Sequence, residues 1–135
     1  MLRFLRHIPP FLPTLIVLVA ICYLSLDADP FPDKDSWFTF PGSDKVVHII
    51  MYGGLTGTFC FDYYRRVAAP CKLWLLIVAL VVAIIVGIVM ELLQAHMGIG
   101  RSGDFVDVIA NSLGALMGIV VGNRLFTRLF INVES

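Results

Sequence analysis

The sequence predicts an all-α membrane protein, a bundle of four transmembrane helices with its N and C termini in the cytoplasm. Hydrophobic residues make up 59% of the 135 residues and charged residues only 15%, whereas a soluble domain carries about 25% charged residues. Apolar runs of membrane length occur four times. Because a domain this small has little interior, it could not bury so much apolar surface in water.

We treat residues 1–135 as a single membrane domain and place its elements from the apolar runs. Prolines precede the first run, where they suit the start of a helix better than its middle. No small-x-small cleavage site follows this run, so we expect a retained helix rather than a signal peptide. Lys72 and Glu91 bound the third run. The predicted spans are about 9–26, 45–62, 72–93 and 104–122, and residues 27–44 form an outer segment.

The distribution of basic residues predicts the orientation. If the spans alternate in direction, Lys34, Lys45 and Arg101 fall on the outer side. The other seven of the ten Lys and Arg residues then fall on the side of the N-terminus. Cytoplasmic loops carry an excess of Lys and Arg, so both termini are predicted to be cytoplasmic. The seven inner residues are Arg3, Arg6, Arg65, Arg66, Lys72, Arg124 and Arg128.

Polar side chains gather at the predicted outer ends of three spans. Groups at such depth in a membrane are usually paired or functional. Several share a helical face: Lys45, His48 and Tyr52 follow i, i+3, i+7 spacing. We therefore predict one polar site at the outer end of the bundle. Its candidate ligand-binding residues are Lys45, His48, Tyr52, Glu91, Gln94, Arg101, Asp107 and Asn111.

Glycines continue the polar face of the fourth span. Asp107 and Asn111 are followed on the same face by glycines at steps of three or four residues. Small residues at this spacing let the backbones of membrane helices approach closely. The polar groups of the fourth span are thus predicted to face the bundle rather than lipid. The predicted helix-packing residues are Gly53, Gly57, Gly114, Gly118 and Gly122.

Each polar residue also has a purely structural interpretation. Asp104 and Asp107 fit the N-cap and N3 positions of a capping box, with aspartate in place of glutamate. Lys45 could be an interfacial anchor whose amino group reaches water. Glu91 could simply pair with Arg101. A convergent site accounts for all of these groups together more simply than separate structural roles do.

The order and spacing of these residues resemble the VanZ-like family of bacterial membrane proteins. The similar pieces are D-K-x-x-H-x-x-x-Y from Asp44, E-x-x-Q from Glu91, and R-x5-D-x3-N-x2-G-x3-G from Arg101, and together they cover about residues 44–118. The family takes its name from a protein associated with resistance to teicoplanin, a lipid-tailed glycopeptide. The resemblance implies a multi-pass protein of the bacterial cytoplasmic (inner) membrane with a link to the cell envelope. It implies no particular reaction.

Three functions remain open at the level of sequence. The first is binding of an anionic lipid headgroup, a lipid-linked wall precursor or a lipid-tailed glycopeptide, with Lys45 and Arg101 holding the negative charge. The second is a membrane enzyme acting on a lipid headgroup, with His48 as base or nucleophile beside Glu91 and Asp107. The third is a structural polar cluster whose function lies with a partner protein.

Several partners are not expected. His48, Glu91 and Asp107 are suitable metal ligands, but the neighbouring Lys45 and Arg101 would repel a metal ion, so we predict no metal and no cofactor. Nor do we expect a nucleic-acid partner, since the composition is that of an integral membrane protein. The sequence does not determine the oligomeric state.

Overall fold

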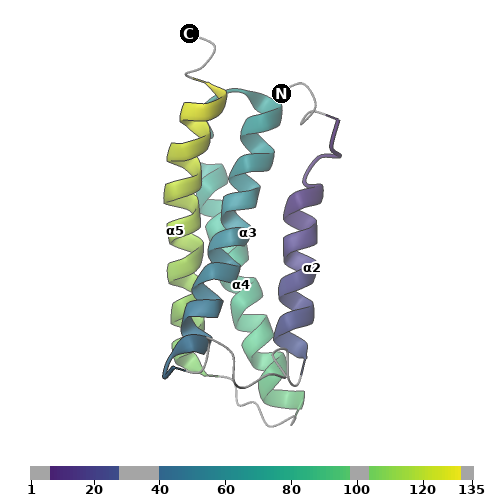
Figure 1. Cartoon of the computed structure of the whole chain (residues 1–135), viewed down its shortest axis with the longest axis vertical. Coiled ribbons are helices and arrows are strands. Elements are labelled where there is room, and N and C mark those ends of the chain that lie inside the picture. The colour runs from purple at the N-terminus through teal and green to yellow at the C-terminus, as the bar shows by residue number, and fades with distance from the viewer. Residues whose placement is uncertain (1–6, 28–39, 98–103, 132–135) are drawn as a thin grey trace.

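A computed structural model describes residues 7–27, 40–97 and 104–131 of the chain. These residues form four helices, which run side by side as a bundle (Figure 1). The predicted all-α architecture is therefore confirmed for the described part of the chain. The helices are α2 (Leu12–Leu26), α3 (Ser43–Val67), α4 (Leu73–Met97) and α5 (Phe105–Phe130).

Local sequence explains where the helices begin and end. A proline lies in the first turn of α2, where its missing N–H costs no hydrogen bond. Gly42 precedes α3 with φ of 86°, a left-handed conformation that glycine adopts without steric cost. Ala68 ends α3 in the same left-handed region, with φ of 49°. Asp104 caps α5 by accepting a hydrogen bond from the Val106 N–H at 2.9 Å, as N-cap residues do.

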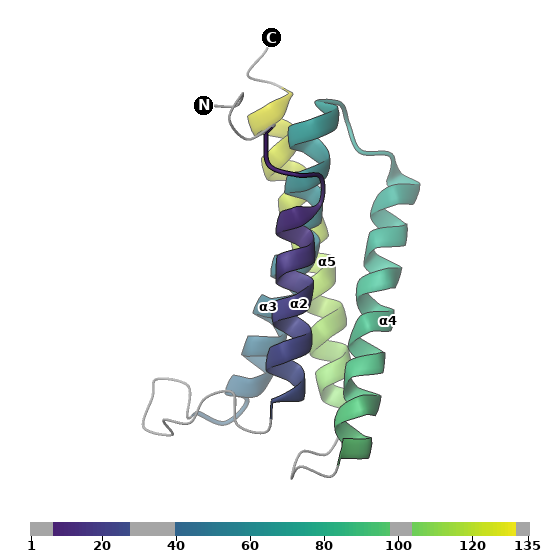
Figure 2. The same ribbon diagram turned by 90° about the vertical axis from the view of Figure 1, so that its right-hand side faces the viewer.

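The topology places α3 and α5 parallel to each other. Both begin at the end of the bundle where α2 and α4 finish (Figures 1 and 2). We call this the His48 end and the opposite one, where α2 begins and α5 finishes, the terminal end. The pairing of α3 with α5 is the most extensive contact between helices. In Figure 2, α4 stands to one side of the other three helices.

Glycines allow α3 and α5 to approach this closely. A Cβ atom on Gly118 would lie 2.2 Å from the Gly53 carbonyl oxygen, and one on Gly114 would lie 2.3 Å from the Ile49 oxygen. A Cβ on Gly122 would lie 3.3 Å from the Gly57 Cα. Gly57 itself differs, since a Cβ added there meets no atom within 4 Å. The room for the α3–α5 contact thus comes mainly from the glycines of α5.

Two of the helices, α4 and α5, are long and apolar enough to cross a membrane by length and composition. The shorter α2 is apolar over 15 residues. Large apolar side chains are exposed along the outer faces of α4 and α5, including Leu73 at 71% and Phe105 at 76%. Such surfaces are typical of contact with lipid or with another protein.

The helices extend beyond the predicted spans at several ends. α3 begins before and ends after 45–62, α4 continues past residue 93, and α5 continues to Phe130. The predicted bounds followed hydropathy, which falls where Arg124 and other polar residues begin. The backbone continues in the helical conformation through these polar residues, because helix formation requires main-chain hydrogen bonds rather than apolar side chains.

Candidate functional site

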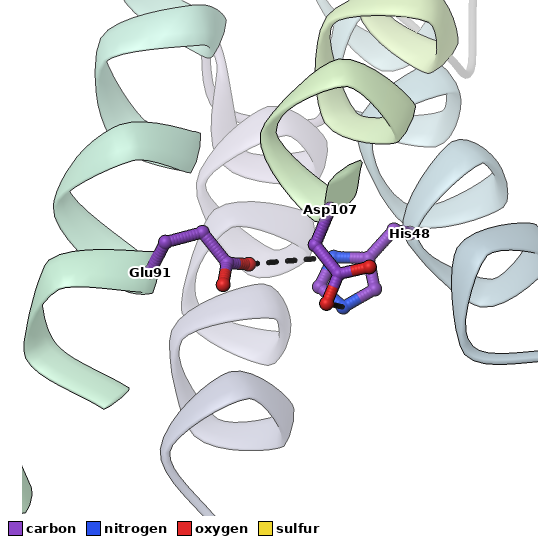
Figure 3. Close-up of side chains that lie close together, drawn as sticks. All are labelled: His48, Glu91 and Asp107. Atoms are coloured by element: carbon purple, nitrogen blue, oxygen red, sulfur yellow. Dashed lines mark ion pairs between the residues drawn. The ribbon is translucent and has the colours of Figure 1, made fainter. Parts of the chain in front are cut away.

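Three helices bring His48, Glu91 and Asp107 together at the His48 end (Figure 3). One ligand-type atom from each residue lies within 4.8 Å of the others, and all three residues are buried. His48 Nε2 is 3.9 Å from Asp107 Oδ2, and His48 Nδ1 is 4.0 Å from Glu91 Oε1. We call these three residues the His–carboxylate cluster. Their predicted convergence is confirmed.

Asn111 fixes the orientation of the His48 ring. Its Oδ1 lies 2.8 Å from His48 Nδ1, and both side chains are buried. An amide oxygen only accepts hydrogen bonds, so Nδ1 is the donor in this pair. In the neutral ring the Nε2 atom then carries a lone pair. This nitrogen faces the carboxylate of Asp107.

Lys45 lies at the edge of the cluster and contacts three carboxylates. Its Nζ is 3.0 Å from Asp107 Oδ1 and 3.2 Å from Asp104 Oδ2, and it also pairs with the neighbouring Asp44. The Val106 N–H and the Lys45 ammonium together hold the pKa of Asp104 below its usual value. These carboxylates stand at the N-termini of α3 and α5, where the helix dipole favours negative charge.

In a capping box, the side chain at N3, here Asp107, would accept a hydrogen bond from the backbone N–H of the N-cap residue Asp104. Glu91 accepts this hydrogen bond instead. The Asp104 N–H donates to Glu91 Oε2 at 3.2 Å, so the start of α5 is bound by a carboxylate from α4. Asp104 therefore occupies the predicted N-cap, but its backbone N–H is satisfied from another helix. As a result, Asp107 is available to Lys45 and His48, which it approaches with different oxygens.

Two buried polar atoms near the cluster have no hydrogen-bond partner among the described residues. They are the Tyr52 hydroxyl and the Asn111 amide nitrogen, on side chains that are 0% and 1% exposed. A Cβ added to Gly87 would lie 3.1 Å from this Asn111 nitrogen. Gly87 was not singled out from the sequence, because nothing marks it apart from other apolar positions of α4. Unpaired buried polar atoms carry a desolvation penalty that a polar ligand would relieve.

Among the remaining candidates, Gln94 contacts another helix instead of the cluster. Gln94 is buried, but its Nε2 donates to the Ser25 carbonyl oxygen at 2.6 Å. It joins α4 to the last turn of α2 and belongs to the contact between these helices. Arg101 lies outside the described residues, as does most of the predicted outer segment 27–44.

The sequence analysis missed a second polar network at the terminal end. Arg65 was predicted only as one of the basic residues on the cytoplasmic side, yet the side chains of Asp62 and Arg65 are both 0% exposed and are paired at 2.6 Å. Arg65 also donates to the Ile8 and Pro9 carbonyl oxygens, and Thr14 binds Asp62 through its N–H and hydroxyl. This network fastens the start of α2 to α3. The i, i+3 spacing of the two charges at the end of an apolar run was the available signal.

An apolar pocket of about 250 Å³ lies between α2, α3 and α4. Its wall on α4 runs from Leu75 to Val86, and its wall on α3 includes Leu55 and Phe59. Val86 precedes Glu91 by five residues, a helical rise of about 7.5 Å. No residue of the His–carboxylate cluster lines this pocket, whereas a second pocket of about 350 Å³, between α4 and α5, is lined by Glu91 and Asp104.

The fold and the site define a helical membrane protein with ionisable residues buried at both ends of its bundle. The VanZ/LLP1 family model matches residues 11–127. The chain therefore belongs to the VanZ/LLP1 family, and the match extends over most of its length. No curated protein and no solved structure shows significant similarity to the chain.

Proposed function

We propose that this protein binds the anionic headgroup of a lipid, or of a lipid-tailed compound, at the His48 end of the bundle. One observation carries the proposal: a pocket of about 350 Å³ is lined by the cluster residue Glu91 and by Asp104, together with apolar side chains of α4 and α5. A ligand with a charged head and an apolar tail matches this pairing. Among the described residues, Lys45 supplies a positive charge at the mouth of the site. Arg101 would add a second positive charge.

Two further features support a ligand rather than a structural cluster alone. The buried amide nitrogen of Asn111 and the Tyr52 hydroxyl lack partners among the described residues. Polar contacts between membrane helices contribute only about 0.6 kcal/mol each on average. Burying several ionisable groups is therefore a costly way to pin helices together. A bound headgroup that reaches these atoms offsets part of the cost.

The orientation completes the proposal. Arg65 is buried in an ion pair with Asp62, so we leave it out of the count of basic residues on each side. The remaining Lys and Arg residues still favour a cytoplasmic location for the terminal end. The His48 end then faces the outer leaflet of a bacterial inner membrane, with all four helices crossing it. At that depth the site would meet phospholipids, lipid-linked wall precursors and lipid-tailed glycopeptides such as teicoplanin. A role in resistance to such compounds would follow from binding them there.

The test is native mass spectrometry of the protein purified from membranes, comparing wild type with Lys45→Met. We expect wild type to retain a phosphate-bearing lipid adduct. The variant should bind it roughly 10- to 100-fold more weakly, because a hydrogen bond to a charged group contributes about 1.5–3 kcal/mol. Lys72→Met is the matched control, since Lys72 is an exposed lysine at the terminal end. Equal adduct in wild type and Lys45→Met would contradict the proposal.

A second candidate function is hydrolysis of the headgroup with His48 as general base. The arrangement that favours it is the Asn111 hydrogen bond to His48 Nδ1, which leaves Nε2 able to accept a proton. Incubating the identified lipid with wild type and His48→Gln separates the two functions. If wild type turns the lipid over, and His48→Gln still binds the lipid but does not turn it over, the protein is an enzyme. Binding without turnover in wild type indicates a binding protein.

A further inference from the structure

Carboxylates outnumber cations at the mouth of the proposed headgroup site. Among the described residues, the ammonium of Lys45 faces Asp44, Asp104 and Asp107, and Glu91 lies behind them. A phosphate approaching this group meets more negative than positive charge. Even with Arg101 counted as a second cation, these four carboxylates outnumber the positive charges, so a further positive charge would help the site to hold an anionic headgroup.

We propose that the His–carboxylate cluster binds one divalent transition-metal ion, of the Zn²⁺ or Mn²⁺ type, and that this ion holds the phosphate of the headgroup. The ligands are His48, Glu91 and Asp107. The role of the phosphate rests on the proposed function, whereas the metal ligands stand on the geometry of the cluster alone.

The spacing of the cluster fits such an ion. Metal bonds to imidazole nitrogen and carboxylate oxygen are about 2.0–2.2 Å long, so two ligand atoms of a tetrahedral ion lie about 3.3–3.6 Å apart. His48 Nε2 and Asp107 Oδ2 are separated by 3.9 Å. This distance is too long for a hydrogen bond between them. Glu91 Oε1 lies 4.0 Å from His48 Nδ1, and one ligand-type atom of each of the three residues lies within 4.8 Å of the others. Side-chain rotations that move these atoms by about 1 Å would bring them to bonding distance of one ion.

The hydrogen bond made by His48 is typical of a metal-binding histidine. A ligating histidine usually donates its second ring N–H to a carbonyl or carboxylate oxygen, which fixes the ring and the tautomer. Asn111 Oδ1 provides this acceptor for Nδ1 at 2.8 Å. The lone pair on Nε2 then faces the Asp107 carboxylate, and two electron-rich atoms turned toward each other favour a cation between them.

Lys45 does not oppose the ion as the sequence analysis expected. Its ammonium is shared with Asp44 and Asp104, which lie outside the cluster. Asp107 meets Lys45 with Oδ1 and faces His48 with Oδ2. One carboxylate can thus serve the lysine and the ion at the same time.

Three protein ligands leave part of the coordination shell of the ion open, as in sites where a metal binds substrate. A phosphate oxygen could occupy this position, with Lys45 close enough to share the charge. The buried amide nitrogen of Asn111, which has no acceptor among the described residues, offers a hydrogen bond to a ligand in the same region.

Titration of delipidated, EDTA-treated protein in detergent with Zn²⁺, and with Co²⁺ as a spectroscopic probe, tests the ligands. We expect one ion per chain and a Co²⁺ absorption spectrum with nitrogen and oxygen ligands. Binding should be lost in the near-isosteric Asp107→Asn and in His48→Ala, and weakened about 10- to 100-fold in Asn111→Ala. His96→Ala is the matched control, because His96 is an exposed histidine on α4. Circular dichroism checks that each variant is folded.

The assignment of the metal ligands would be overturned if folded wild type bound no metal ion, or if wild type and Asp107→Asn bound the ion equally well. The lipid adduct separates this inference from the proposed function. An adduct that survives complete removal of metal by EDTA overturns the bridging role and leaves headgroup binding intact. An adduct that is lost with the metal and returns with Zn²⁺ supports the bridge. Metal binding by a protein that never carries an adduct overturns the headgroup function and, with it, the bridge.

Discussion

Asp62→Ala will destabilise the protein by about 3–5 kcal/mol, the usual cost of removing one partner from a buried ion pair. The Arg65 side chain is 0% exposed and is paired with Asp62 at 2.6 Å. Without the carboxylate, the buried guanidinium loses the ion-pair partner that lies 2.6 Å away. Thr14 also loses the acceptor of two hydrogen bonds, which join the start of α2 to α3. Equilibrium unfolding in detergent measures the change in the free energy of unfolding.

Two variants give this experiment its controls. Arg66→Ala removes an exposed charge from the same turn and should change stability by no more than about 0.5 kcal/mol. The double variant Asp62→Leu/Arg65→Leu removes both charges and should cost less than Asp62→Ala alone, since apolar replacements of a buried pair are often tolerated. If Asp62→Ala were as stable as Arg66→Ala, the buried pair would not hold the terminal end together.

Gly118→Ala will separate α3 from α5 and destabilise the bundle by about 1–3 kcal/mol or more, the range for overpacking. The added methyl group would lie 2.2 Å from both the Gly53 carbonyl oxygen and the Thr56 hydroxyl. The Gly53 oxygen is backbone, so relief requires α5 to move away from α3. Thr56 would then lose its 2.9 Å hydrogen bond to the Ala115 carbonyl oxygen. The loss appears as a lower midpoint of thermal unfolding.

The buried thiol of Cys60 provides the readout. It is 0% exposed on α3, so its reaction with a thiol-specific dye reports unfolding in a background where Cys22 and Cys71 are serine. Gly54→Ala and Gly57→Ala are matched controls, because a Cβ at either position meets no atom within 4 Å. The sequence pattern groups Gly57 with Gly118, whereas the structure separates them. Equal losses for Gly57→Ala and Gly118→Ala would contradict the described packing.

Only part of the site could be predicted from the sequence. Helical spacing and the scarcity of charge within apolar runs were enough to bring His48, Glu91 and Asp107 to one end of the bundle. Spacing could not show that Gln94 turns to Ser25 on α2, because that depends on how α2 lies against α4. It also could not show that Glu91 binds the N–H of Asp104. Such contacts join residues of different helices, and no periodicity within one helix encodes them.

Composition and hydropathy by themselves determined the class of protein, its helical architecture and the end at which His48, Glu91 and Asp107 gather, because lipid excludes unpaired polar groups from apolar spans. The tertiary structure alone decided which of these groups contact one another. It paired α3 with α5 in parallel, buried Asp62 and Arg65 at the terminal end, and shared the Asp107 carboxylate between Lys45 and His48. The physical reason is that hydrogen bonds and ion pairs depend on distances of a few ångströms, which the packing of helices sets.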